Sequence, residues 1–151
     1  MDPSRGSNFN NPSTRPVVIT RFSEVYLVGA EAYLQSGNKT KAAELLNVIR
    51  QRAAFRKTNS AAQNTAAATA MLVKDTDITV DFILDERSRE LFGEWMRNQD
   101  LVRTQSLVRR VKLWNNEASP YVKDFHVLRP IPQTEIDRTV EGPPFTQNTG
   151  Y

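Results

Sequence analysis

Apolar residues recur at helical spacing in the first half of the chain and predict two consecutive helices. Over residues 21–36 and again over 39–55, apolar side chains return every three or four positions, which is typical of amphipathic helices. Gly37 supplies a stop signal, and Asn38 or Thr40 supplies a cap for the second helix. The short loop allows only an antiparallel helical hairpin. The residues expected to face inward are Phe22, Val25, Tyr26, Gly29, Ala32 and Tyr33 in the first helix, and Ala42, Ala43, Leu46, Ile49 and Ala53 in the second.

The order of bulky and small residues in this hairpin is that of a tetratricopeptide unit. The small side chains of Ala30 and Ala42 would let the two helix backbones approach closely. A single unit of this kind cannot bury its own apolar face, so it must pack on another hairpin or on an equivalent surface. The residues at the consensus positions are Tyr26, Ala30, Tyr33, Ala42, Leu46 and Ile49.

The segment before the hairpin and the segment after it lack a clear helical pattern. Pro12 and Pro16 disfavour a helix near the start, and residues 17–19 could form a short strand or enter a core. Residues 57–78 are rich in alanine and polar residues but offer little to bury, which predicts a surface loop with at most one helical turn.

Helical periodicity returns after this loop and fades at the prolines near the end. A third helix is predicted over about 80–96, and a fourth over about 98–114 with a break around Thr104. The third is capped by Asp77 or Thr79, and helices are not expected beyond Pro120. The predicted fold class is therefore all-α. The expected organisation is a single domain over 1–151, with an irregular or extended lead-in (1–19), a tetratricopeptide-like helical hairpin (20–56), a loop (57–78), helices (79–115) and an irregular, proline-containing tail (116–151). The tail is expected to pack across the helices through its apolar residues, Phe125, Val127, Leu128, Ile131, Ile136 and Phe145.

Composition removes several classes of chemistry. The 151 residues contain no Cys and a single His, His126, so a disulfide framework, a thiolate nucleophile and a His- or Cys-based metal site are not expected. No glycine-rich phosphate-binding motif is present, and no cofactor is predicted. Twenty basic against seventeen acidic residues give a net charge of +3, far from the dense positive charge of a nucleic-acid-binding protein. No apolar run approaches the roughly 20 residues of a membrane span, and the first residues do not resemble a signal peptide.

The densest group of charged residues lies in the predicted third helix. Glu86, Glu90 and Glu94 would align at i, i+4 and i+8, and paired carboxylates are what glycoside hydrolysis requires. Carboxylates on one helix do not face each other across a sugar, however, and arginines stand at ion-pair spacing from them. We therefore interpret the group as structural and keep a glycosidase as an alternative to be tested. The predicted ion-pair cluster comprises Asp85, Glu86, Arg87, Arg89, Glu90, Glu94 and Arg97.

Basic and aromatic residues near the end of the fourth helix allow two interpretations. Trp114 and Tyr121 could form a stacking platform for sugars, or Trp114 could simply be a core residue. His126, between two apolar residues, is expected to be a structural histidine rather than a ligand. The basic residues before Trp114 could hold phosphates but fit a solvated helical face better, so no nucleic-acid partner is predicted; they are Arg103, Arg109, Arg110 and Lys112.

Three separated motifs together resemble the C-terminal portion of the SusD/RagB family. Their order and spacing, rather than any one of them, carry the resemblance, which extends over about residues 17–151. The motifs are the hairpin at 21–34 (RFSEVYLVGAEAYL) and 42–53 (AAELLNVIRQRA), the charged stretch at 83–91 (ILDERSREL) with Glu94, Arg97 and residues 100–103 (DLVR), and residues 128–136 (LRPIPQTEI) with 147–151 (QNTGY).

The resemblance implies a function that composition could not indicate. Members of this family are surface-exposed outer-membrane lipoproteins that bind glycans or other nutrients and cap a SusC-type TonB-dependent transporter. They are not enzymes. Their α-helical, tetratricopeptide-like hairpins form the scaffold and are associated with the transporter contact. The charged and Pro-Ile-Pro motifs are expected to hold helices and tail together.

The chain also departs from the family pattern. Family members are several times longer and carry a signal peptide and a lipidated N-terminal Cys, none of which is present here. We therefore expect either a C-terminal piece of a full-length binder or a truncated homologue, with an exposed apolar patch that promotes association. No ligand-binding residue can be transferred by position. The alternative is a small, stand-alone tetratricopeptide-like module that binds a protein or peptide.

Overall fold

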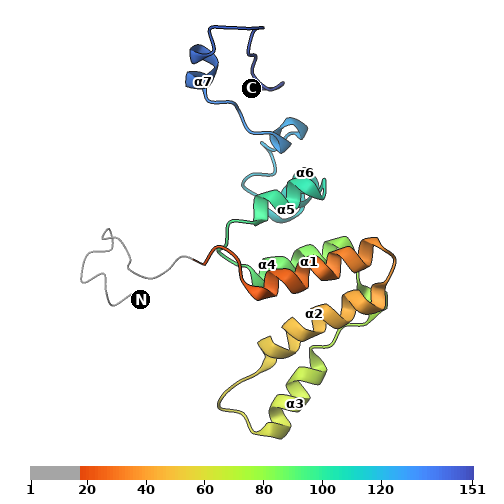
Figure 1. Ribbon diagram of the computed structural model, residues 1–151. Helices are drawn as coiled ribbons and strands as arrows, with labels where there is room; N and C mark the ends of the chain where they lie inside the picture. Colours follow the sequence, from red (N-terminus) through yellow and green to blue (C-terminus); the bar gives the residue numbers. More distant parts are fainter. Residues whose placement is uncertain (1–17) are drawn as a thin grey trace, which may run out of the picture. The chain divides into compact units, whose positions relative to one another are not determined.

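The computed structural model describes residues 18–151, which form helices joined by turns and loops without any strand (Figure 1). The predicted all-α, tetratricopeptide-like fold is confirmed. Most of the predicted lead-in, with Pro12 and Pro16, lies outside the described residues, and Val18 and Ile19 are exposed. Within residues 18–151, no helix combines the length and apolar character needed to cross a membrane. The chain divides into two compact units, one ending at Leu91 and the other spanning Phe92–Tyr151.

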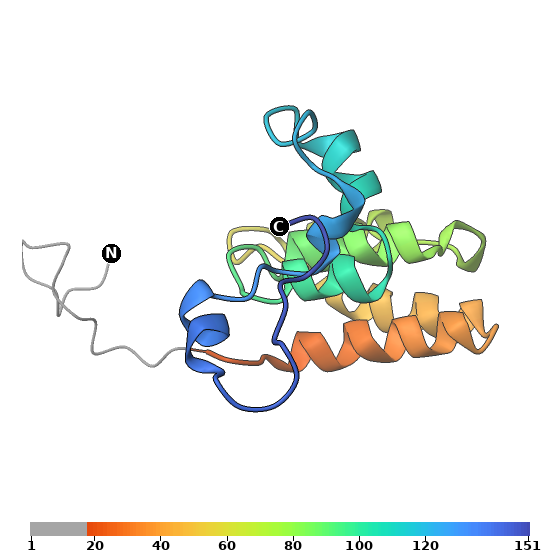
Figure 2. The same ribbon diagram turned by 90° about the horizontal axis from the view of Figure 1, so that it is seen from above.

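The first unit is built on a hairpin of α1 (Phe22–Gln35) and α2 (Lys39–Ala54), as predicted. Gly37 ends α1 with a left-handed backbone, φ 84°, which a glycine adopts without steric cost. The Asn38 side chain then caps α2 by accepting a hydrogen bond from the Lys41 N–H at 3.0 Å. Local signals in the sequence therefore fix the turn that reverses the chain between the helices (Figures 1 and 2).

The predicted inward face of α1 was wrong in part. Phe22 and Val25 are 71% and 55% exposed, and Tyr33 is also exposed, whereas Ser23, Leu27 and Ala30 are buried. Apolar residues occupy more than one side of this helix, so their periodicity does not single out the face that packs. In α2, the predicted inward residues are buried except Ala53, which is exposed near the end of the helix.

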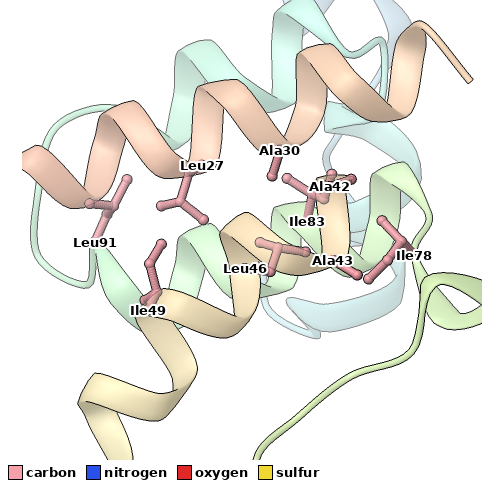
Figure 3. Packing of buried hydrophobic residues seen from close by; sticks show 9 residues of the cluster. All are labelled: Leu27, Ala30, Ala42, Ala43, Leu46, Ile49, Ile78, Ile83 and Leu91. Carbon is pink, nitrogen blue, oxygen red and sulfur yellow. The ribbon is translucent and has the colours of Figure 1, made fainter. Parts of the chain in front are cut away.

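The core of this unit lies among α1, α2 and α4 (Val80–Glu90) (Figure 3). Small side chains allow the close helix contact that the tetratricopeptide pattern predicted, since Ala30 and Ala42 are fully buried. Gly29 serves the same purpose, because a Cβ atom there would lie 2.9 Å from Cδ1 of Leu45. The buried cluster comprises Leu27, Ala30, Ala42, Ala43, Leu46, Ile49, Ile78, Ile83 and Leu91.

The segment between α2 and α4 corrects the prediction of a loop. It contains a ten-residue helix, α3 (Ala61–Ala70), and a short 3-10 turn, η2 (Asp75–Asp77). No α3 residue is buried, so intrinsic alanine propensity and a capping box between Ser60 and Gln63 define it rather than a packed face. Helix α4 is capped by Thr79, one of the two predicted caps, but ends at Glu90 instead of continuing to Met96.

The second unit begins with α5 (Arg97–Arg103) and α6 (Leu107–Trp114), and the predicted break around Thr104 is confirmed. After Pro120, where no helix was expected, the chain forms a 3-10 turn, η3 (Asp124–Val127), and the six-residue helix α7 (Gln133–Arg138). Pro132 immediately precedes α7, so the proline starts this helix and does not interrupt it.

The last residues of the chain hold the Pro-Ile-Pro segment. The Gln147 side chain accepts a hydrogen bond from the Ile131 N–H and donates one to the Ile131 carbonyl, both at 2.8 Å. The Tyr151 hydroxyl donates to the Leu128 carbonyl at 2.7 Å. These contacts explain why the two tail motifs occur together, because one motif supplies the hydrogen-bond partners of the other.

Candidate functional site

Glu86 is a carboxylate through which α4 is tied to α2. Its Oε2 atom accepts hydrogen bonds from Nη1 of Arg50 at 2.5 Å and from Nη2 of Arg89 at 2.8 Å. The Glu86 side chain is only 6% exposed, so the two arginines supply the compensation that a buried charge requires. Hydrogen bonding to Glu86 and the nearby charge of Asp85 raise the pKa of Arg89 against the opposing effect of burial.

Glu90 performs the same role one turn further along α4. Nη2 of Arg52, from α2, lies 2.6 Å from both carboxylate oxygens, and Nη1 of Arg21 lies 2.8 Å from Oε1. Arg21 also donates to the backbone carbonyl of Glu90. Burial alone would raise the pKa of Glu90, but the hydrogen bonds from Arg52 and Arg21 outweigh it and lower that pKa below its usual value.

A third pair joins α4 to α1. Nη2 of Arg87 lies 2.7 Å from Oε1 of Glu24, and the Arg87 side chain is only 1% exposed. The sequence singled out Arg87 but gave no signal for Glu24, because the two residues are 63 positions apart. The sequence also gave no signal for Arg21, Arg50 and Arg52, because their partners lie on another helix.

The structure corrects the predicted alignment of three glutamates on one helix. Glu86 and Glu90 lie on α4, but α4 ends at Glu90, and Glu94 falls in the turn before α5. Asp85 and Arg89 also belong to α4, whereas Arg97 is the first residue of α5. The predicted group is therefore divided among α4, the turn after it and the start of α5, and of the three glutamates only Glu86 and Glu90 share a helix.

A cavity of about 410 Å³ lies between α2 and α4, beside these ion pairs. Residues one helical turn apart supply its walls, because positions i and i+4 share a face in each helix. Met71, just after α3, completes the lining. The lining residues are Ile49, Arg50 and Ala53 from α2, Met71, and Phe82, Glu86, Arg89 and Glu90 from α4.

The two aromatic candidates from the sequence are both on the surface of the second unit. Trp114, the last residue of α6, is 71% exposed, and Tyr121 is 75% exposed. The alternative that Trp114 is a core residue is therefore wrong. Their rings are accessible to a ligand.

Of the four basic residues before Trp114, three are exposed and one is buried. Arg110 is 5% exposed, and Arg103 donates to Oδ1 of Asp100 at 2.9 Å, whereas Lys112 is exposed. Arg103 and Arg109 are exposed as well, so the expected solvated surface holds for three of the four residues.

His126 has a local structural role. Its Nδ1 atom accepts a hydrogen bond from the Lys123 N–H at 2.8 Å, which closes the turn at η3. The imidazole also packs near Phe125 and Tyr151, with ring centroids 4.4 and 6.0 Å away. These contacts connect the turn with the end of the chain.

An antiparallel helical hairpin, a third packed helix and ion pairs between them define an all-α scaffold of the tetratricopeptide-like class. The profile of the SusD family matches residues 2–151, so the chain belongs to the SusD family. The family assignment therefore extends over both compact units.

Two relatives from Formosa agariphila illustrate this similarity. SusD-like protein P38 is 37% identical over 92 residues, which is 61% of this chain and 18% of that protein. SusD-like protein P25 is 28% identical over 143 residues, which is 90% of this chain and 24% of that protein. The chain thus spans less than a quarter of the length of these curated relatives. No solved structure matches the chain at a significant level.

Proposed function

We propose that this chain is part of a non-enzymatic nutrient-binding protein that presents glycans to a SusC-type TonB-dependent transporter at the outer-membrane surface. The observation that carries the proposal is the match to the SusD family over residues 2–151. The first unit would act chiefly as scaffold, because its buried charged residues Glu86 and Arg87 join α4 to α2 and α1. The ligand class, the transporter and the location are all parts of this proposal.

The hydrogen bonds that Glu86 and Glu90 accept from arginines support a non-catalytic role. A glycosidase needs one carboxylic acid that is protonated when it meets the substrate. Each of these carboxylates instead accepts hydrogen bonds from two arginines, and the pKa of Glu90 is lowered, which keeps it ionised. Both side chains are better suited to joining helices than to transferring protons.

Exposed aromatic rings support contact with sugars. Pyranose rings present C–H groups that pack on the face of an aromatic side chain, and Trp114 and Tyr121 are accessible for such packing. We assign these two residues as the neutral-sugar contact within this chain.

The test is affinity electrophoresis of the 151-residue chain through gels containing a panel of neutral polysaccharides. We expect retention by at least one glycan and a several-fold loss of affinity on Trp114→Ala or Tyr121→Ala. Trp95→Ala is the matched control, since Trp95 is 57% exposed in the same unit, and it should leave retention unchanged. Absence of retention throughout the panel would contradict the assignment of Trp114 and Tyr121, and release of sugar products would contradict the non-enzymatic role.

A protein-binding role is the second candidate because α1 presents apolar side chains to solvent. Phe22, Val25 and Val28 are each more than half exposed. Co-purification of a TonB-dependent transporter with the chain, and its loss on Phe22→Ser, would support the transporter contact. Binding of a peptide in place of a transporter would favour a stand-alone interaction module.

A further inference from the structure

We propose that the cavity between α2 and α4 is a second ligand site, which takes the carboxylate of an acidic sugar on Arg50 and Arg89. The assignment of a sugar rests on the proposed function, whereas the assignment of a carboxylate rests on the cavity itself. Its volume of about 410 Å³ falls within the range of small-molecule sites, roughly 300–1,000 Å³. It lies in the first unit, apart in sequence from Trp114 and Tyr121.

The lining combines an apolar surface with charged groups at its edge. Ile49, Met71 and Phe82 offer carbon surface for the body of a sugar ring. The Arg50 guanidinium carbon lies 5.9 Å from the centre of the Phe82 ring, so this cation is held against an aromatic side chain. A ligand in the cavity would therefore meet an apolar surface and a fixed guanidinium together, the combination that orients small ligands in pockets.

The arginines retain hydrogen-bond donors for a ligand. Arg50 uses Nε for the Met71 carbonyl and Nη1 for Glu86, and Arg89 uses Nε and Nη2 for Glu86. Within residues 18–151, no acceptor is found for Nη2 of Arg50 or Nη1 of Arg89. Each guanidinium therefore keeps one nitrogen whose N–H groups can donate a charge-assisted hydrogen bond to a carboxylate oxygen.

The local charge also favours an anion. The ion pairs beside the cavity contain four guanidinium groups and three carboxylates. The guanidinium groups are those of Arg21, Arg50, Arg52 and Arg89, and the carboxylates are those of Asp85, Glu86 and Glu90. The oxygen atoms of Glu86 and Glu90 already accept hydrogen bonds from these arginines, so they have little capacity left for a cationic ligand. One added carboxylate would balance the group, whereas a neutral sugar would not.

Glu86 is a positioning residue in this arrangement. It fixes Arg50 from α2 and Arg89 from α4 on the same carboxylate oxygen, so both guanidinium groups stay at the cavity edge. The hydrogen bond that Nε of Arg50 donates to the Met71 carbonyl, at 2.6 Å, fixes this side chain further. Preorganisation of this kind lowers the entropy lost when a ligand binds.

The experiment is calorimetric titration of the 151-residue chain with D-glucuronate, with D-glucose, acetate and sulfate as comparison probes. We expect glucuronate to bind and glucose, acetate and sulfate to bind at least tenfold more weakly. Arg89→Gln should weaken glucuronate binding about tenfold or more, the effect of losing a charge-assisted hydrogen bond. The affinity should also fall as salt is added.

Two control variants test whether the effect of Arg89→Gln is specific to the cavity. Arg56→Gln removes an exposed arginine just beyond α2 whose side chain donates to the carbonyls of Ala53 and Phe55, and it should leave glucuronate binding unchanged. Arg89→Lys keeps the charge but has a single nitrogen in place of the three that serve Glu86 and the ligand, so it should bind glucuronate with intermediate affinity. Circular dichroism of Arg89→Gln should show the wild-type helix content.

Each outcome of the titrations has a separate meaning. Equal binding of glucose and glucuronate, no binding of glucuronate, or binding unaffected by Arg89→Gln would each overturn the site. Binding of acetate or sulfate as tight as that of glucuronate would overturn the assignment of a sugar. Retention of neutral glycans that depends on Trp114, without any effect of Arg89→Gln, would leave the proposed function standing while this inference fails.

Discussion

At the scale of single residues, two helices end in the same turn with different residues at its left-handed position. Gly37 follows α1 with φ 84°, and Gln105 follows α5 with φ 53°. At both ends, the N–H of this residue and the next N–H donate to carbonyls of the last helical turn, the pattern of a Schellman motif. Glycine adopts this backbone freely, whereas a residue with a Cβ atom is strained there by about 1–2 kcal/mol.

Substitutions at these two positions should change the free energy of unfolding in opposite directions. Gln105→Gly should raise the free energy of unfolding by about 0.5–1 kcal/mol, because relief of strain exceeds the added entropy of the unfolded chain. Gly37→Ala should lower it by about 1 kcal/mol. Both Trp residues lie in the second unit, so urea unfolding followed by Trp fluorescence reports on Gln105 and far-ultraviolet circular dichroism reports on Gly37.

The control is Gln105→Ala, which keeps a Cβ atom and should change stability little. A gain from Ala as large as that from Gly would mean that the Gln side chain, and not its backbone conformation, is the source of the strain.

Residues that end or cap a helix through contacts with nearby backbone were predictable from the sequence. Residues that form ion pairs between helices were not. Gly37, Asn38 and Thr79 carry local stop and cap signals, and the structure uses all three. Glu24 was missed because its partner, Arg87, is distant in the chain. The lining of the α2–α4 cavity was missed for the same reason, since it exists only once two helices lie side by side.

At the scale of elements, buried ion pairs join α4 to α1 and α2. The sequence predicted the charged helix and ion pairs at helical spacing along it, of which the pair of Glu86 and Arg89 is present. Contacts between helices are the larger part of the network, because Glu86 also binds Arg50 and Glu90 binds Arg52 and Arg21. Helix α3 was missed because it lacks a buried face, and periodicity is informative only where a helix packs.

Removal of Glu90 should destabilise the first unit in a pH-dependent manner. Glu90→Gln leaves the Arg21 and Arg52 guanidinium groups without their carboxylate, so the free energy of unfolding should fall by about 1–3 kcal/mol at pH 7. The pKa of Glu90 is lowered in the folded chain, so its contribution is complete above the unfolded value of about 4.3 and is lost as the pH falls through the folded value. Urea unfolding between pH 3 and pH 7 measures this difference.

A surface pair provides the matched control for Glu90. Glu44 lies 2.6 Å from Lys41, but both side chains are more than half exposed, so Glu44→Gln should cost about 0.5 kcal/mol or less. A difference between wild type and Glu90→Gln that stays constant down to pH 3 would contradict the assignment of a charged Glu90 in the fold.

At the scale of the whole molecule, buried apolar side chains are distributed unequally between the two units. Among the described residues, ten of the twelve buried hydrophobic residues lie before Phe92, and the other two are Leu101 and Leu107. Hydrophobic burial is the main stabilising term in folding, so the first unit should be the more stable of the two. The second unit depends more on hydrogen bonds such as those of Gln147 and Tyr151.

Native-state hydrogen exchange should reveal this difference directly. Amides in α1, α2 and α4 should exchange more slowly than those in α5 and α6, because regions with few buried apolar contacts open at lower free energy. Leu46→Ala, at a fully buried position of α2, should lower the protection of the first unit by about 2–4 kcal/mol. Val48→Ala is the control on the same helix, since Val48 is 44% exposed and its truncation should have a much smaller effect. An equal loss of protection in both units on Leu46→Ala would mean that they unfold as one cooperative body.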